Sequence, residues 1–408
     1  MSDAAAAAEL AARASYGRLV AYLAAHWRDV ARAEDALGDA LVAALETWPR
    51  TGVPDKPEAW LLTAARRRLV DGARHAGVAV AAEADLTLML DEHADDAGRA
   101  PVSDERLALL FVCAHPDIDE AARTPLMLQT VLGLDAARIG SAFLVAPATM
   151  GQRLVRVKAK IRETGIRFEV PERREMAARL PAVLDAIYAA YGSGWEDVAG
   201  ADPRRRGLAE EAIWLGRLVA RLLPDEPEAL GLLALMLHCE ARRPARRDDA
   251  GAYVPLREQD VARWSRPMLE EAETVLATAA RFAAPGRFQL EAAIQSAHAQ
   301  RARSGAADWE AIALLYEGLL RCAPTVGARV AAAAALAEAR GDEAGLRALD
   351  TMPADAVAAY QPYWALRAQL LKKLGRTGHA RDAYDRAIGL SEESAVREFL
   401  MARAAEMR

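Results

Sequence analysis

Residues 134–161 read LDAARIGSAFLVAPATMGQRLVRVKAKI, which is the pattern of two short helices joined by a turn. The spacing predicts a first helix over 136–143, a turn at Leu144 and Val145, and a second helix opened by Pro147, where the missing N–H of proline costs nothing. Apolar residues recur along the second helix at gaps of four, three and four residues: Met150, Leu154, Val157 and Ile161. This spacing predicts an apolar stripe that packs against the rest of the fold.

Polar side chains suited to reading DNA fall on another face of the second helix. They are Thr149, Gln152, Arg153, Arg156 and Lys160. A guanidinium can bind guanine O6 and N7 at two points, and a lysine can hold a phosphate, so this face has the chemistry of a recognition helix in a helix-turn-helix. The pattern fits equally well an amphipathic helix whose basic face is only solvated.

The composition predicts an all-α, cytoplasmic protein. The 408 residues are enough for two or three domains, and an alanine-rich chain with 6% aromatic residues favours helices. The chain has no apolar run of about 18 residues that would predict a membrane span, and its start, MSDAAAAAEL, lacks the features of a secretory signal. Cys113, Cys239 and Cys322 are far apart and odd in number, so we expect a reduced compartment without a disulfide framework.

The charges are unevenly distributed along the chain. The net charge of −6 argues against a generally sticky nucleic-acid binder. Residues 149–170, however, hold six Lys or Arg against two acidic residues, and residues 64–75 hold four against one. Between them, residues 76–103 hold six acidic residues and one arginine. This distribution predicts two DNA-contacting modules kept apart by an acidic, flexible linker.

Three helices are expected in the first module, over 16–27, 33–48 and 58–75. The prolines and Gly52 predict an ordered loop over 49–57. The second helix should face the core with four large apolar side chains: Leu37, Leu41, Leu45 and Trp48. Its outer face should carry acidic side chains: Glu34, Asp35, Asp39 and Glu46. Such a face repels phosphate, so it is either a surface for a basic protein partner or simply solvated.

The third helix of this module combines an aromatic side chain with arginines along one stripe. Trp60, Thr63, Arg67 and Arg74 follow one another at gaps of three, four and seven residues. Bases stack on an indole and phosphates pair with guanidinium groups, so the stripe suits a single-stranded or unstacked nucleic acid. A single tryptophan on a helix is also an ordinary core residue, and the spacing leaves both interpretations open.

The sequence gives little support for catalysis. The seven histidines show no HExxH spacing, and the pairs Cys113 with His115 and His238 with Cys239 lack two further metal ligands. The chain contains no glycine-rich phosphate loop of the GxxxxGK[ST] kind. We therefore expect a protein that is not an enzyme and that holds no metal and no cofactor.

Beyond Pro171 the chain has the pattern of successive helix pairs. Six positions near its end match the tetratricopeptide signature: Trp364, Ala368, Leu371, Ala380, Tyr384 and Ala387. Arg367 and Glu392 break the signature at two others. Stacked helix pairs normally present a concave surface to a peptide or a domain. They can also form a closed helical domain that has no ligand.

The order of these parts resembles the extracytoplasmic-function RNA polymerase sigma factors, in the subgroup with a C-terminal tetratricopeptide-like extension. The runs YGRLVAYLAAHWRDVARAEDALGDALVAALETWP and PDKPEAWLLTAARRRLVDGARH resemble their region 2. The run DERLALLFVCAHPDID, together with residues 134–161, resembles their region 4. The resemblance implies region 2 over 1–76, an acidic flexible linker over 77–102, region 4 over 103–170 and a tetratricopeptide-like helical domain over 171–408.

The resemblance also implies roles for single residues. Core RNA polymerase would be bound through its β′ clamp helices and β flap, with the clamp helices meeting Glu34, Asp35 and Asp39. The −10 element of promoter DNA would be captured and melted by Arg50, Lys56, Trp60, Arg66, Arg67, Arg68 and Arg74. The −35 element would be read by Thr149, Gln152, Arg153, Arg156 and Lys160. The C-terminal domain would regulate initiation and could bind a further protein partner.

Two other functions compete with this one. The chain could be a helix-turn-helix transcription regulator without a role as a polymerase subunit, or a helical-repeat interaction scaffold. A plain regulator has no need of a DNA-melting module, and this favours the sigma factor.

Overall fold

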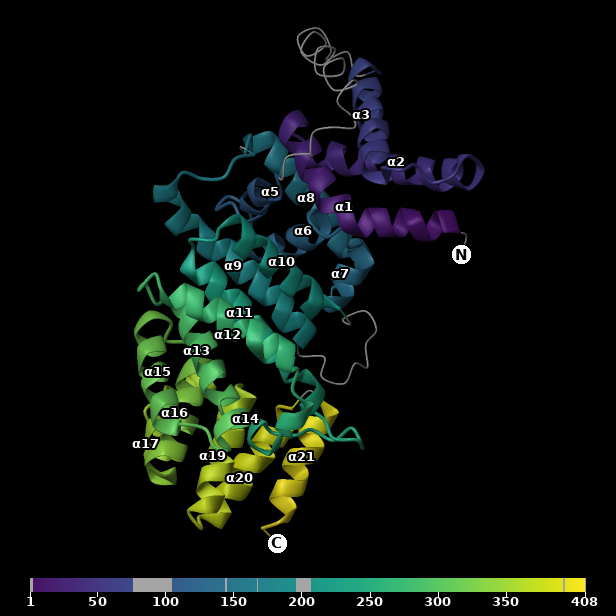
Figure 1. Ribbon diagram of the computed structural model, residues 1–408. Helices are drawn as coiled ribbons and strands as arrows, with labels where there is room; N and C mark the ends of the chain where they lie inside the picture. Colours follow the sequence, from purple (N-terminus) through teal and green to yellow (C-terminus); the bar gives the residue numbers. More distant parts are fainter. Residues whose placement is uncertain are drawn as a thin grey trace. The chain divides into compact units, whose positions relative to one another are not determined.

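A computed structural model describes residues 3–75, 105–143, 145–166, 168–195, 207–391 and 393–407. These residues form helices and no strand, apart from one isolated bridge between Arg247 and Tyr253 (Figure 1). This confirms the all-α class expected from the composition. Among the described helices, none combines the length and the apolar character needed to cross a membrane. The expected linker over 77–102 lies outside the described residues.

The chain divides into two compact units. The first comprises Met1–Asp197 with Asp202–Ala212, and the second comprises Val198–Ala201 with Ile213–Arg408. Both predicted DNA-contacting modules therefore lie in the first unit.

The first three helices are α1 (Asp3–Trp27), α2 (Val30–Thr51) and α3 (Pro57–His75), and they pack on one another. The Asp29 side chain caps α2 by accepting a hydrogen bond of 3.1 Å from the Arg32 amide. Arg18 in α1 forms an ion pair with Glu58 in the first turn of α3. These contacts make the three helices one folded module.

Helix α2 is longer than the sequence predicts. It continues through Pro49 to Thr51, so the expected start of the loop at residue 49 is wrong. The ring of Pro49 fixes φ at about −65°, which a helix allows, but it removes the N–H that would otherwise donate to the Leu45 carbonyl oxygen. Gly52, at φ +86°, then ends the helix by donating to the Trp48 carbonyl oxygen at 3.0 Å.

The second part of this unit contains α5 (Arg106–Cys113), α6 (Glu120–Thr130), α7 (Ala136–Ala142) and α8 (Pro147–Thr164). Gly140 lets the turn and α8 approach α7 closely, since a Cβ there would lie 2.6 Å from the Val145 carbonyl oxygen of the turn and 3.4 Å from the Met150 Cβ of α8. Met150, Leu154 and Ile161 of the predicted stripe are buried. The left-handed Gly165 ends α8 by donating to the Ile161 carbonyl oxygen.

Helix α9 (Arg173–Trp195) belongs to the first unit by its packing, although the sequence placed it with the C-terminal region. It packs on α5 and α6 with a buried face that includes Val183 and Ile187. The Thr124 hydroxyl of α6 donates to the Ala186 carbonyl oxygen at 3.2 Å. The expected boundary at residues 170 and 171 therefore falls inside this compact unit.

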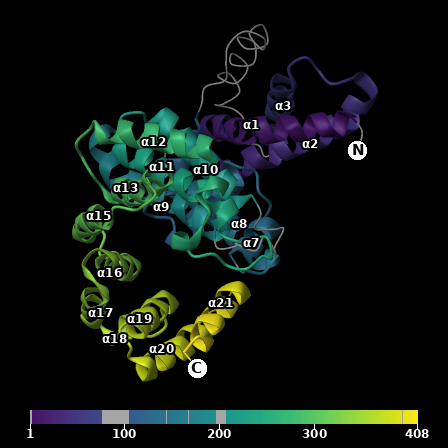
Figure 2. The same cartoon turned by 60° about the horizontal axis from the view of Figure 1, so that its bottom comes forward.

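The second unit is built around α11 (Pro227–Ala241), which is buried along most of its length between α12 (Arg266–Ala280) and α13 (Arg287–Ala299). Among the described residues, eight further helices follow along the chain, and those from residue 309 onward lie one after another (Figure 2). They are α14 (Arg301–Ser304), α15 (Trp309–Cys322), α16 (Val326–Arg340), α17 (Asp342–Asp350), α18 (Ala354–Val357), α19 (Gln361–Lys373), α20 (Thr377–Gly389) and α21 (Ser394–Ala405). Helix α10 (Leu208–Leu222) precedes them along the chain.

The residues that matched the tetratricopeptide signature lie where α19 and α20 pack together. Five of them are buried: Ala368, Leu371, Ala380, Tyr384 and Ala387. Trp364 is partly buried against the same cluster, and its indole N–H donates to the Ala358 carbonyl oxygen at 3.2 Å. The small residues allow the two helices to approach closely, as paired helices require.

Candidate nucleic-acid and protein interfaces

The exposed face of α2 is both acidic and apolar. Asp35, Asp39 and Glu46 are exposed, and Val42, which lies between them on the same stripe, is 55% exposed. The carboxylate of Asp39 lies 4.0 Å from the Arg68 guanidinium of α3. Acidic groups around an exposed aliphatic side chain favour a protein partner with basic groups around an apolar spot.

Leu45 also lies on the exposed side of α2, and its expected place in the core is wrong. Its side chain is 49% exposed. A gap of four residues advances around a helix by about 40° more than a full turn, so the spacing of Leu37, Leu41 and Leu45 drifts off the buried face. The buried face instead combines the predicted Leu37 and Trp48 with the small residues Ala33, Ala40 and Ala44.

Glu34 does not share the exposed face with the other acidic residues, as the sequence had suggested. It is 8% exposed, and its carboxylate lies 2.5 Å from the Nζ of Lys158 in α8. Burial raises the pKa of Glu34, whereas the Lys158 ammonium lowers it. Burial and the Glu34 carboxylate both raise the pKa of the neighbouring Tyr16 hydroxyl. Glu34 is therefore part of an internal contact and not of the outer surface.

The arginines of α3 differ in their surroundings. Arg66 is turned toward α1, where its guanidinium lies 5.1 Å from the centre of the Tyr22 ring and donates to the Tyr22 hydroxyl. Arg67 and Arg68 are exposed. The side chain of Arg74 lies outside the described residues. Arg67 and Arg68 thus remain accessible to a phosphate backbone, whereas Arg66 mainly braces α3 against α1.

Trp60 lies at the start of α3 and joins it to the end of α2. Its ring packs edge-on against the buried Trp48, with 5.6 Å between ring centres. The side chain is only partly buried, so one part packs in the core and another remains open to a ligand. Arg50, in the last turn of α2, and Lys56, in the loop that follows the helix, are both exposed. The Nε of Arg50 donates to the Glu46 carbonyl oxygen at 3.1 Å.

On α8, the predicted DNA-reading residues form a mostly exposed surface. Thr149, Gln152 and Arg156 are exposed, and Arg153 is partly buried. The Nε of Arg156 donates to the Gln152 carbonyl oxygen at 3.3 Å, so this guanidinium lies along the helix. Lys160 donates to the Asp117 carbonyl oxygen between α5 and α6. These side chains can face a major groove, with Lys160 already held by the protein.

The sequence interpretation did not include Val155, which is 64% exposed on α8 beside Gln152 and Arg156. A branched apolar side chain in this position can contact the methyl group of thymine in a major groove. The signal was available, because Val155 falls outside the stripe of Met150, Leu154 and Ile161 and therefore cannot pack in the core.

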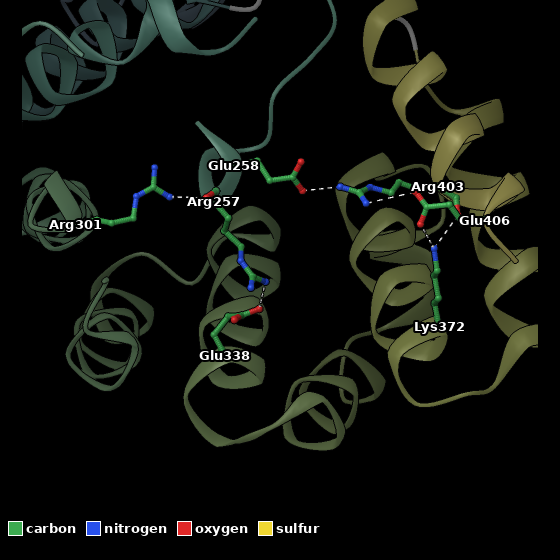
Figure 3. Close-up of polar contacts among 7 residues, drawn as sticks. All are labelled: Arg257, Glu258, Arg301, Glu338, Lys372, Arg403 and Glu406. Atoms are coloured by element: carbon green, nitrogen blue, oxygen red, sulfur yellow. Dashed lines mark hydrogen bonds and ion pairs between the residues drawn. The ribbon is translucent and has the colours of Figure 1, made fainter. Parts of the chain in front are cut away.

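A segment of the second unit between α11 and α12 is tied to helices much later in the chain (Figure 3). Arg301 of α14 donates to the Arg257 carbonyl oxygen at 2.7 Å, and the Arg257 guanidinium pairs with Glu338 of α16. The neighbouring Glu258 carboxylate lies 2.5 Å from Arg403 of α21. These contacts, here called the brace, connect the segment at residues 257 and 258 to α14, α16 and α21.

A pocket of about 260 Å³ lies beside this brace. It is lined by Leu256, Arg257, His298, Arg301, Ala306, Ala307 and Trp309. Burial lowers the pKa of His298 to about 4, so its ring is neutral near pH 7. The two guanidinium groups bind protein carbonyl and carboxylate oxygens, which makes the pocket part of the brace. In the part of the chain that the structure describes, no three His, Cys, Asp or Glu residues are grouped to hold a metal ion.

Comparisons with known proteins bear on both units. Residues 12–78, which cover most of α1 to α3, match the family described as sigma-70 region 2. Residues 179–280, from within α9 to the end of α12, match a family of unknown function, DUF6596. An uncharacterized protein of Rhizobium meliloti (strain 1021) is 39% identical over 371 residues, which cover 90% of this chain and 88% of that protein. No solved structure matches the chain.

Proposed function

The chain belongs to the same family as the Rhizobium meliloti protein and carries a sigma-70 region 2 at its N-terminus, and from this we propose that it is an extracytoplasmic-function sigma factor that directs core RNA polymerase to specific promoters. The observation that carries the proposal is the region 2 match over α1 to α3. A transcription regulator without a polymerase role would not need this module. A role in binding RNA polymerase therefore accounts for the first unit better than either competing function.

The exposed stripe on α2 is the proposed contact with the polymerase β′ clamp helices. Asp35 and Asp39 supply negative charge, and Val42 and Leu45 supply exposed apolar surface next to it. Interfaces of this kind gain specificity from paired charges and affinity from a small apolar centre. Glu34 is not part of this proposed contact with the clamp helices, because its carboxylate is buried against Lys158. Val42 and Leu45 are included in its place, because both are exposed.

We assign promoter contacts to two exposed basic surfaces of the first unit. Near the −10 element, Arg50, Lys56, Arg67 and the open part of Trp60 would hold the separated strand by phosphate contacts and stacking. Helices α7 and α8 would act as the helix-turn-helix of region 4, which also meets the β flap. In this arrangement Thr149, Gln152 and Arg156 enter the −35 major groove.

The C-terminal unit is proposed to regulate these contacts through a protein partner, as a tetratricopeptide-like extension would. The closely packed α19 and α20, with small buried residues at the signature positions, support this interpretation. Its DUF6596 match extends from α9 to α12. The regulatory part would therefore begin within the first unit rather than after it.

In vitro run-off transcription with bacterial core RNA polymerase tests the proposal. The purified protein should produce specific transcripts that core polymerase alone does not produce. Arg156→Ala should reduce discrimination between the preferred −35 sequence and its variants by roughly 1–3 kcal/mol, because a base contact is lost. Arg174→Ala, an exposed change at the start of α9, is the matched control and should leave promoter choice unchanged. Failure of the protein to bind core polymerase would contradict the proposal.

A further inference from the structure

Residues 246–259, here called the strap, lie between α11 and α12 in the chain and contact helices near its end. Both ends of the strap are anchored in one apolar cluster, which contains the buried Ala245, Trp264 and Ala299. Between these anchors the strap contacts α14, α16 and α21 (Figure 3). Helices α15 to α21 follow a curve (Figure 2), and only its inner side can present helices so far apart in the chain to one short segment. The strap therefore lies on the inner side of this curve.

Side-chain contacts of different chemistry hold the strap on this surface. Its Arg247 lies 2.5 Å from the carboxylate of Glu393, the residue before α21. Its Tyr253 packs edge-on against Phe399 of α21, with 5.6 Å between ring centres. The brace at residues 257 and 258 completes the series. Along the strap, the helices therefore receive a cation, an aromatic ring, a second cation and an anion.

The strap is held at the surface rather than in the core. All its residues except Gln259 are partly or fully exposed. In the brace, the side chains of Glu258 and Arg403 are 54% and 35% exposed, and ion pairs this open to water contribute little to stability. A pocket of about 260 Å³, lined in part by Leu256 of the strap and Trp309 of α15, also leaves the strap incompletely packed. The strap can therefore leave its position without opening the core.

The helices that receive the strap do not depend on it for ion pairing. Glu338 of α16 also lies 3.5 Å from the ammonium of Lys373. Arg403 of α21 also lies 3.5 Å from the carboxylate of Glu406, and its guanidinium lies 5.1 Å from the centre of the Phe399 ring. Both charges keep a partner of opposite sign when the strap leaves, so the surface beneath it persists as a recognition site.

We propose that this inner surface is a binding site for a protein segment, that the strap occupies it as an internal ligand, and that a partner segment of the same chemistry displaces the strap. The partner segment presents a cation to Glu393 and an aromatic ring to Phe399. Next to these it presents a cation to Glu338 and an anion to Arg403. The proposal deepens, and rests on, the role of the C-terminal unit in binding a protein partner. The strap lies within the DUF6596 match and α14 to α21 lie beyond its end, so displacement links the two parts.

A fluorescently labelled peptide with the sequence of residues 246–259 tests the site in the full-length protein by anisotropy. In the parent protein the tethered strap competes at a high effective concentration, so the peptide should bind weakly. Tyr253→Ala combined with Glu258→Ala removes two contacts of the strap and leaves the helices unchanged. The peptide should bind this release variant at least about tenfold more tightly, because a larger fraction of the protein has an open site. The matched control Arg266→Ala breaks an exposed pair on α12 and should bind like the parent.

A second release variant, in which glycine and serine replace residues 247–258 at equal length, keeps both anchored ends and should also bind the peptide more tightly. Adding Arg403→Ala to either release variant should remove most of this gain, because the cation that receives the anion is lost. Amide exchange in α19 and α20 checks that each variant is folded.

Two results would overturn the proposal. One is a peptide that binds neither release variant more tightly than the parent, and the other is equally tight binding of a peptide with the same residues in scrambled order. Peptide binding is measured without polymerase or DNA. It therefore decides whether the strap covers a binding site even if run-off transcription contradicts the proposed sigma-factor function.

Discussion

Glu228 should contribute strongly to the stability of the C-terminal unit, because it caps a helix other than its own. It lies in the first turn of α11, and its Oε2 accepts a hydrogen bond of 2.9 Å from the Phe288 amide of α13. Its Oε1 accepts from the Gln289 amide at 3.1 Å and from the Gln289 side-chain amide at 3.2 Å. The residue before α13 is Gly286, and a Cβ there would lie 2.4 Å from the Glu228 carboxyl carbon. The glycine makes room for the carboxylate.

The expected cost of Glu228→Ala follows from these bonds. Hydrogen bonds to a charged group contribute about 1.5–3 kcal/mol, and loss of a helix cap costs about 0.5–2 kcal/mol. The contributions overlap, so we expect a loss of about 2–3 kcal/mol. Glu228→Gln keeps one acceptor oxygen but turns an amide donor toward the amides of α13, and about 1–2 kcal/mol should be lost. Glu270→Ala breaks only an exposed pair with Arg266 and should cost less than about 0.5 kcal/mol.

Hydrogen–deuterium exchange read by mass spectrometry checks this prediction in the full-length chain. Because every 1.4 kcal/mol is a factor of ten, amides of α13 should exchange about 30- to 150-fold faster in Glu228→Ala. Exchange in α19 and α20, which lie farther along the chain, should change much less. If α13 exchanged no faster in Glu228→Ala than in Glu270→Ala, the cap would not stabilise the unit. Since the DUF6596 match ends at residue 280, a positive result would also show that α13, which lies beyond the end of this match, depends on a residue inside it.

Three further predictions follow from the burial and exposure of particular residues. Arg67→Ala should reduce permanganate reactivity of −10 thymines with core binding intact, because Arg67 is exposed, and unchanged reactivity would exclude a role in melting. Truncation after Ala212, where the first unit ends, should leave a soluble protein whose transcription falls several-fold. Truncation after residue 171 uncovers α5 and α6 and should cause aggregation, and equal solubility of the two truncated proteins would contradict this. Burial lowers the pKa of both His238 and His298 to about 4, so the unfolded chain binds more protons below pH 6.5. The C-terminal unit should therefore lose stability as the pH falls from 6.5 toward 4, and equal urea midpoints at pH 7 and pH 5 would refute it.

Local patterns in the sequence were sufficient for the helical class and for many helix positions. Pro147 opens α8 as expected, and Met150, Leu154 and Ile161 are buried, because periodic apolar spacing and helix-end residues act within a few positions of the chain. The region 2 interpretation of the first helices is supported by the match over residues 12–78. The tetratricopeptide-like interpretation of the C-terminal region remains a prediction, since the match there is to a family of unknown function.

What the sequence could not determine depends on contacts between distant segments. Leu45 was assigned to the core because its spacing fits, but only the packed helices show that its flank of α2 is open. Glu34 was assigned to the surface as a charged residue normally would be, and its burial depends on Lys158, 124 positions away. Helix α9 joins the first unit through partners on α5 and α6. A side chain's periodicity is a property of its own helix, whereas its burial depends on what the rest of the chain places against it, and only the tertiary structure decides that.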